Sequence, residues 1–185
     1  MILRRFRPNP RGRNIAALYG AIVAQARSPA FYTSYGVADT VEGRFDLIVL
    51  HLVLLLARLD RGEDAAPGVG QELFDVFCRD LDANLREMGV GDLAVPKRMR
   101  RFGEAFYGRQ AAYLAAIAAP GERELEMAVA RNIFADAEAG HGSSHGALRL
   151  ARYARTALRQ FEAQEEGALL RGDVVFPEPE AIADA

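Results

Sequence analysis

Hydrophobic residues recur every three or four positions along most of this chain, and no segment shows a convincing alternation of apolar and polar residues. This spacing is typical of amphipathic helices, in which the apolar side chains form one stripe. Helices are predicted over residues 12–27, 71–88, 96–118, 122–137 and 144–166. A further helix is predicted over the more apolar residues 40–60. The pattern therefore predicts an all-α fold.

The most apolar segment covers residues 40–60. Its uninterrupted apolar run, residues 47–57, is 11 residues long and contains only His51 as a polar residue. A run of this length is too short to span a bilayer, and a helix that is apolar on all sides belongs in a protein core. We therefore expect a single compact domain of about six helices around this central helix.

The domain boundaries follow from the flanking composition. The helical pattern occupies residues 12–166, after a basic N-terminal tail at residues 1–11. Residues 167–185 are acidic and contain prolines, and we expect them to form a loose C-terminal tail.

The composition and charge exclude some classes of function. Half of the 185 residues are hydrophobic and 26% are charged, as in an ordinary globular protein. The single cysteine, Cys78, rules out an intramolecular disulfide. The net charge of −2 argues against broad affinity for nucleic acids. Residues 1–38, however, hold six arginines and no acid, a balance that can favour an anionic membrane surface.

The start of the central helix carries more polar residues than a helix start needs. Asp39 and Glu42 have the spacing of a capping box, with Asp39 as the N-cap. Gly43 lies inside the helix, where it costs up to about 1 kcal/mol relative to alanine. A residue without a side chain there suggests a close approach by another backbone or by a partner.

Capping leaves the next two charged residues, Arg44 and Asp46, unexplained. One explanation is that they belong to a binding surface. The other is an internal ion pair that ties this helix start to the turn at Asp92. The residues alone support the two explanations about equally.

Few residues suggest catalysis or metal binding. A metal cluster can be drawn from Asp136, Glu138, His141 and His145. The glycines and serines around the two histidines favour solvated loop residues instead. We expect His51 to be hydrogen-bonded in the core and Cys78 to be an inert thiol on an apolar helix face. No catalytic residue, metal or other cofactor is therefore expected.

Two groups of basic residues are candidates for an anionic partner. The first is a stripe on the last long helix, formed by Arg149, Arg152, Arg155 and Arg159. Such a stripe is most often a solvated helix face. The second is denser and comprises Lys97, Arg98, Arg100 and Arg101. It lies at a helix start, where positive charge opposes the helix dipole, and it therefore favours an anionic partner more strongly.

Several motifs resemble those of one known family. They are Phe31-Tyr32, Tyr35-Gly36-Val37, the run from Asp39 to Leu47, Leu50-His51-Leu52, the runs 71–75, 80–82, 85–92 and 95–97, and Phe106-Tyr107-Gly108-Arg109. Together they resemble the ubiquinol–cytochrome c chaperone family, whose members are assembly factors for the cytochrome bc1 complex, respiratory complex III. The resemblance covers residues 12–135. The chain is similar to the short bacterial form, which lacks the long N-terminal extension of mitochondrial members.

The resemblance implies a non-enzymatic, all-helical chaperone that binds newly synthesised cytochrome b for haem insertion and assembly. It also implies that the protein acts at the cytoplasmic face of a bacterial inner membrane, or in the matrix of a mitochondrion. The expected partners are cytochrome b and the membrane surface, with the ribosome as a further candidate, but not DNA. We expect one client-binding surface formed by Tyr35, Asp39, Arg44, Phe45, Asp46, Arg86, Glu87, Asp92, Lys97 and Arg98.

Two other functions are compatible with the residues. An RNA- or ribosome-binding helical module would use the stripe from Arg149 to Arg159, and its RNA affinity would depend steeply on salt. A small metal-dependent enzyme would use His141 and His145. The enzyme is the weaker of these two hypotheses, because the two histidine side chains lie on the same side only if their segment is a helix.

Overall fold

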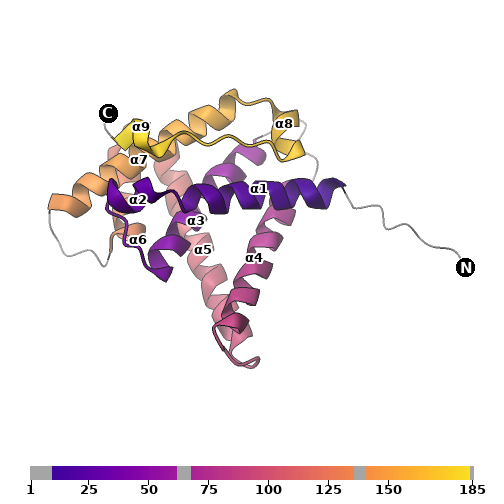
Figure 1. Ribbon diagram of the computed structural model, residues 1–185. Coiled ribbons are helices and arrows are strands. Elements are labelled where there is room, and N and C mark those ends of the chain that lie inside the picture. Colours follow the sequence, from indigo (N-terminus) through magenta and orange to yellow (C-terminus); the bar gives the residue numbers. More distant parts are fainter. Residues whose placement is uncertain (1–9, 62–67, 136–140, 184–185) are drawn as a thin grey trace, which may run out of the picture.

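The computed structural model describes residues 10–61, 68–135 and 141–183 (Figure 1). All regular secondary structure within these ranges is helical, which confirms the all-α prediction. Six helices are long, as expected, and three are short. In chain order they are α1 (Pro10–Ala26), α2 (Pro29–Thr33), α3 (Val41–Leu59), α4 (Val69–Glu87), α5 (Val95–Ala118), α6 (Arg123–Ile133), α7 (His141–Ala163), α8 (Glu166–Arg171) and α9 (Pro179–Ala183).

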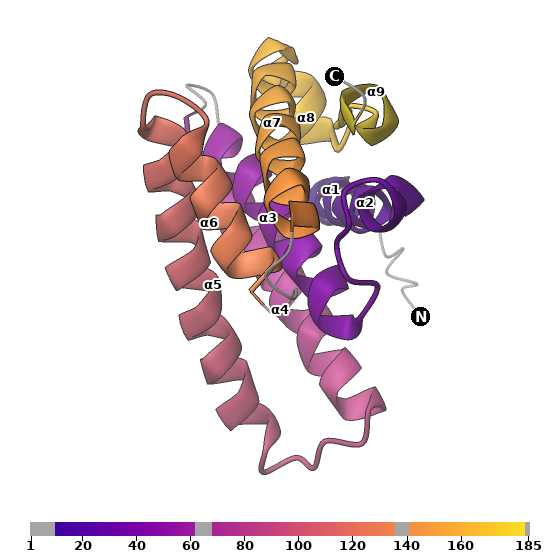
Figure 2. The same ribbon diagram turned by 90° about the vertical axis from the view of Figure 1, so that its left-hand side faces the viewer.

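Helix α3 is the centre of the fold, as its apolar sequence predicts. It contacts α1, α4, α5, α6 and α7, and most of its side chains between Leu47 and Leu59 are buried. Figure 2 shows α3 between α1 on one side and α5 and α6 on the other. Burying each of its large apolar side chains contributes roughly 1.5–3 kcal/mol before the entropy cost is subtracted.

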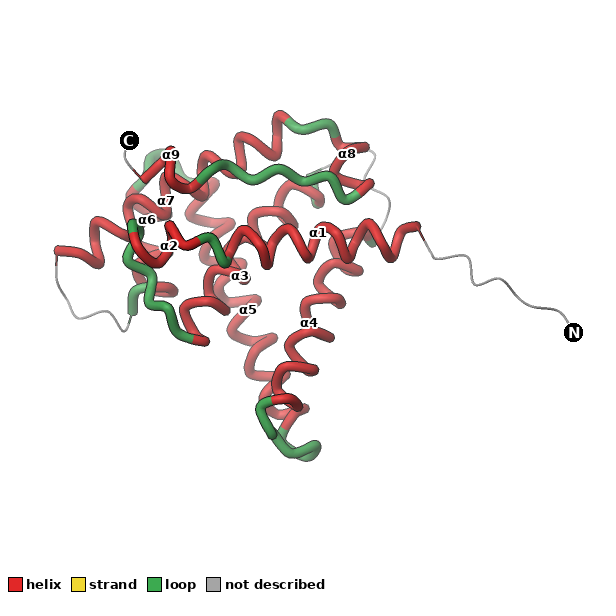
Figure 3. The backbone as a smooth tube through the Cα atoms, viewed as in Figure 1, coloured by secondary structure: helices red, strands yellow, loops and turns green. Residues whose placement is uncertain are grey.

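Helices α4 and α5 form a hairpin whose closed end projects from the rest of the molecule (Figures 1 and 3). The turn begins at Gly89, whose φ of 78° is left-handed, as expected for a glycine after a helix. The amide of Val90 donates to the carbonyl of Leu85 (3.0 Å), and the amide of Gly89 donates to that of Arg86 (2.9 Å). These bonds end α4 sharply and place residues 88–94 at the projecting end.

The C-terminal segment is packed against the domain, which corrects the expectation of a loose tail. Helices α8 and α9, with residues 172–178 between them, lie against α1 and α7 (Figure 1). Leu169 is fully buried. The ring of Phe176 contacts those of His51 and Phe161, at centroid distances of 5.5 and 5.1 Å. The apolar residues of this segment therefore complete the core over α3, despite its prolines and acids.

Candidate binding surface

Tyr35, the first of the expected client-binding residues, lies inside the fold. The residue is only 1% exposed to solvent, and its hydroxyl donates a hydrogen bond to the carbonyl of Pro179 (2.8 Å). Its ring lies 5.3 Å from that of Phe31 and 6.3 Å from that of Tyr153. Tyr35 thus fastens the loop before α3 to the C-terminal segment. This burial corrects the expectation that Tyr35 meets a client directly.

Thr40, rather than Asp39, caps α3. The hydroxyl of Thr40 accepts a hydrogen bond from the amide of Gly43 (3.1 Å), so the predicted capping box of Asp39 and Glu42 is wrong. Asp39 instead forms an exposed ion pair with Arg44 (2.7 Å). The hydrogen bond from Arg44 lowers the pKa of the Asp39 carboxyl. Because threonine and aspartate are both good caps, the sequence could not distinguish the two neighbours.

Two glycines make room for the loop before α3. A Cβ atom at Gly43 would overlap the carbonyl oxygen of Ala38, and a Cβ atom at Gly146 in α7 would overlap that of Tyr35. The close approach expected at Gly43 is therefore made by the chain's own backbone. The two glycines let residues 35–38 pass tightly between α3 and α7.

Asp46 is buried and ties α3 to α5. The residue is 9% exposed to solvent, and its carboxylate lies 2.8 Å from the guanidinium of Arg109. That guanidinium also lies over the ring of Phe45, 5.8 Å from the centroid. An internal ion pair at Asp46 is therefore present, but its partner is Arg109 and not the turn at Asp92. The burial corrects the expectation that Asp46 is a surface contact for a client.

At the hairpin turn, Arg86 connects the two arms. Its guanidinium pairs with Asp82 one turn earlier (2.7 Å) and with Asp92 in the turn. Glu87 is exposed beside it. Arg86 and Asp92 therefore set the shape of the turn, and their charges largely cancel.

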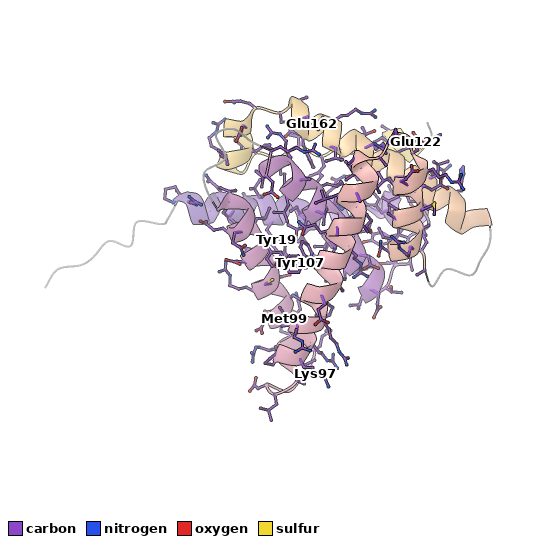
Figure 4. All side chains as sticks on the ribbon, turned by 180° about the vertical axis from the view of Figure 1, so that it is seen from behind. Tyr19, Lys97, Met99, Tyr107, Glu122 and Glu162 are labelled. Atoms are coloured by element: carbon purple, nitrogen blue, oxygen red, sulfur yellow. The ribbon has the colours of Figure 1, made fainter. Side chains whose placement is uncertain are left out.

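The first turns of α5 carry the other expected hairpin residues, Lys97 and Arg98, both exposed. Figure 4 shows Lys97 and Met99 near the closed end of the hairpin and Tyr107 higher on the same helix. The closed end projects beyond the start of α3 (Figures 1 and 3). The structure therefore does not join the charged residues of the two motifs into one patch.

Apolar side chains provide the connection between the start of α3 and the hairpin. The ring of Phe45 lies 5.2 Å from that of Phe102 in α5 and 6.1 Å from that of Phe77 in α4. Phe45, Phe102 and Met99 are only partly buried, and Val41, one turn before Phe45, is 67% exposed. We call Val41, Phe45, Met99 and Phe102 the apolar strip. Its members share one face of each helix, because residues three and four apart are neighbours on a helix.

Charged side chains border the apolar strip. The Asp39–Arg44 ion pair flanks Val41 at the start of α3, and Arg98 lies one turn before Phe102 on α5. Asp39 and Arg44 also line a surface depression whose other lining residues are Arg27, Pro29, Tyr32 and Thr33. The strip is therefore a partly exposed apolar surface with a charged rim.

The four arginines of the α7 stripe all make contacts within the protein. Arg149 donates to a carbonyl of the loop before α3 (2.7 Å), and Arg152 pairs with a carboxylate at the start of α6 (3.2 Å). Arg155 donates to carbonyls of the α5–α6 connection, and Arg159 to the hydroxyl of Thr156 (3.1 Å). Three of the four arginines therefore join α7 to its neighbours, whereas Arg159 is exposed and bonds only within α7.

The core histidine and the cysteine lie where the sequence predicts. His51 Nδ1 lies 2.7 Å from the carbonyl of Leu47, and Nε2 lies 3.0 Å from the hydroxyl of Tyr153. Because a carbonyl only accepts, Nδ1 carries the proton and Nε2 accepts from Tyr153. Burial lowers the pKa of His51 to about 4. Burial also raises the pKa of the Cys78 thiol, as expected for an inert cysteine.

Among the described residues, no three His, Cys, Asp or Glu side chains are arranged to hold a metal ion. Of the cluster drawn from the sequence, Asp136, Glu138 and the side chain of His141 lie outside the described residues. Helix α7 begins at His141, so the segment with the two histidines is helical and not the loop expected from the sequence, and His145 is exposed. In the described part of the chain, no helix has the length and apolar character needed to cross a bilayer.

Three residues that shape this region were not among the site residues expected from the sequence, although Arg109 and Val41 lie within the quoted motifs. Arg109 follows Phe102 and Phe106 at helical spacing, so its position on the inward face of α5 was a usable signal. Val41 and Leu93 gave no such signal. Their exposures of 67% and 98% depend on which faces the neighbouring helices leave uncovered.

Comparisons with known proteins give consistent results. The model of a family described as ubiquinol-cytochrome C chaperone matches residues 33–176, more than half of the chain. The crystal structure of the Cbp3 homolog from Brucella abortus is similar at 34% sequence identity and a TM-score of 0.80, with 92% of each chain covered. No curated protein matched. The family match begins at residue 33 and continues beyond residue 135, the end of the resemblance seen in the sequence, through α7 and α8.

Proposed function

Because this chain belongs to the ubiquinol-cytochrome C chaperone family, we propose that it is a non-enzymatic assembly chaperone of the cytochrome bc1 complex and binds newly synthesised cytochrome b. The observation that carries the proposal is the family match over residues 33–176. The likeness to the Brucella abortus structure over 92% of both chains supports it. The site of action would be the membrane face at which cytochrome b is inserted, which is the cytoplasmic face in a bacterium.

The apolar strip is the surface best suited to this client. Cytochrome b is a hydrophobic membrane protein, so a chaperone for it needs exposed apolar area. In the strip, Val41 is 67% exposed, and the rings of Phe45 and Phe102 are partly buried. An apolar area of this kind with a polar rim is typical of interaction surfaces.

The expected client-binding residues take different parts in this proposal. Asp39, Arg44 and Phe45 contact the client at the start of α3. The hairpin residues Arg86, Glu87, Asp92, Lys97 and Arg98 form the border of the surface towards the closed end. Tyr35 and Asp46 act indirectly, because they are buried and position the loop and the helix that carry the strip.

Replacing Val41 by aspartate tests this proposal directly. The substitution puts a charge into the strip, and because Val41 is 67% exposed it should leave the fold intact. Transferring the apolar contact back to water costs about 1 kcal/mol or more, so recovery of cytochrome b with the protein should fall about fivefold. The measurement is co-purification of cytochrome b from cells that express each variant.

The matched control is Val175→Asp, because Val175 is 59% exposed in the segment between α8 and α9, away from the strip. This variant should retain wild-type recovery of cytochrome b, and both variants should keep the wild-type melting temperature. Wild-type recovery with Val41→Asp, or an equal loss in both variants, would count against the strip as the client surface.

No observation favours the RNA-binding alternative. Three of its four arginines on α7 are engaged with α6, the α5–α6 connection and the loop before α3. Each of these contacts would compete with a phosphate for the guanidinium. We therefore put forward the chaperone function alone.

A further inference from the structure

We propose that the closed end of the α4–α5 hairpin docks on an anionic membrane surface, with Met88 and Leu93 inserted among the headgroups and Lys97, Arg98 and Arg101 binding lipid phosphates. This surface adjoins the apolar strip, and Lys97 and Arg98 lie at the border between the two. The inference goes beyond the proposed function, because docking on lipid requires no cytochrome b.

The apolar part of the argument comes from two exposed side chains. Leu93 is 98% exposed and Met88 is 60% exposed, and they lie on either side of the hairpin turn. Single exposed apolar residues are common on proteins. These two, however, both lie at the end of a hairpin that projects from the molecule (Figures 1 and 3). Such a projecting point can enter a bilayer surface without any other element being moved.

The electrostatic part comes from the residues around the turn. Residues 86–101 contain five basic and two acidic residues, a net charge of +3 in a chain whose net charge is −2. Arg86 already pairs with Asp92, and Arg100 pairs with Glu104 (3.3 Å). Within the described part of the chain, Lys97, Arg98 and Arg101 form no ion pair within 4.0 Å. Three unneutralised cations therefore lie in the first two turns of α5, directly after the turn that carries the two exposed apolar side chains.

The protein's own stability does not explain this arrangement. Positive charge at the start of α5 is unfavourable to the helix dipole, since helix starts prefer acidic residues. The three side chains are exposed and do not pack into the core. Because these basic residues destabilise the start of α5 and make no stabilising contact with the core, an anionic partner outside the protein is the better explanation for them.

The shape and composition of the hairpin end favour a bilayer over a protein segment. A convex end that combines apolar side chains with cations suits insertion at a lipid interface, where both kinds of group gain free energy. A peptide is bound more readily by a groove than by a convex end, and the two depressions described on this surface lie elsewhere, at the start of α3 and beside α7. With no described helix able to span a membrane, contact through the hairpin end would be peripheral.

A tryptophan at position 93 tests the insertion of the turn. The chain contains no tryptophan, so Leu93→Trp gives a single fluorescent reporter at a fully exposed site. With phosphatidylcholine vesicles that contain phosphatidylglycerol, its emission should shift to shorter wavelength; with pure phosphatidylcholine it should not. Val175→Trp, placed away from the hairpin, should not shift with either vesicle. No shift at position 93, or the same shift at both positions, would overturn the proposal.

Charge removal tests the electrostatic part in a sedimentation assay with the same vesicles. Each basic residue near an anionic surface contributes about a fivefold gain in binding, so Lys97→Ala with Arg98→Ala should weaken binding about 25-fold. The control removes two exposed arginines of α6, in Arg123→Ala with Arg131→Ala, and should change binding much less. Equal losses in the two double variants would overturn the proposal.

The remaining outcome concerns a protein partner. If the tryptophan at position 93 responds to synthetic acidic segments of cytochrome b and not to anionic vesicles, the hairpin end belongs to the client surface and the membrane proposal is wrong. Because the vesicle assays contain no cytochrome b, their failure leaves the outcome of the Val41→Asp experiment unaffected.

Discussion

At the scale of single residues, the polar groups buried beside α3 form one hydrogen-bonded chain. The amide of Gln25 donates to the hydroxyl of Tyr153 (2.9 Å), which donates to His51 Nε2, while Nδ1 donates to the carbonyl of Leu47. Every member of this chain has a partner only when the imidazole is neutral. The chain explains how a histidine is tolerated in the most apolar helix of the protein.

His51 should make the stability depend on pH. Its pKa is about 4 in the folded protein and 6.5 in an unfolded chain, so between these values the unfolded state binds more protons. The contribution of His51 to the free energy of unfolding is therefore complete above about pH 6.5. It is lost as the pH falls towards 4, which lowers the free energy of unfolding by about 3 kcal/mol in total. Urea denaturation across this range should show that decrease in the wild type.

The control for this prediction is His51→Gln, which keeps a polar side chain of similar size but cannot titrate. It should be less stable near neutral pH and should lose less stability on acidification than the wild type. Parallel pH profiles for the two proteins would show that His51 does not cause the effect.

Part of this residue-level detail could be predicted from the sequence. A histidine inside an apolar helix is expected to be a satisfied core residue, and His51 is one. Its partner Tyr153 lies 102 residues away, and no local pattern identifies a contact of that kind. The same limit applies to Asp46, whose position suggested an ion pair but not that the partner is Arg109.

At the scale of elements, the Asp46–Arg109 pair fixes α3 against α5. The side chains of the two residues are 12% and 22% exposed. Removing one partner of a buried pair leaves an uncompensated charge, so Asp46→Ala should destabilise the protein by about 3 kcal/mol. The measurement is the free energy of unfolding in urea.

Asp39→Ala is the matched control on the same helix start. The Asp39–Arg44 pair is also 2.7 Å long, but both of its side chains are more than half exposed. Solvent screens such pairs, so this variant should stay close to wild-type stability. If both variants are equally stable, Asp46 does not tie the two helices together.

The helices differ in how well the sequence reveals them. The six long ones show at least three turns of apolar spacing, and all six were predicted. Helices α2, α8 and α9 contain five or six residues each, fewer than two turns, so they have no period to detect. Their position depends on tertiary contacts, such as the bond from Tyr35 to Pro179 and the burial of Leu169.

At the scale of the whole molecule, the surfaces proposed for client and membrane lie on the same side of the protein. The start of α3 and the closed end of the hairpin both lie below α1 in Figure 1, whereas α8 and α9 lie above it. One orientation would therefore let the hairpin end contact lipid while the apolar strip contacts cytochrome b. The sequence predicted that both motifs matter, but not that apolar contacts through Phe45 and Phe102, rather than charges, connect them.

The central claim is that cytochrome b binds at the apolar strip, and photocrosslinking in cells tests it most directly. A photoreactive amino acid at position 41 should give an adduct that contains cytochrome b, and the same group at position 175 should not, while both proteins still support assembly of the bc1 complex. Absence of the cytochrome b adduct at position 41, or equal adducts at both positions, would contradict the account.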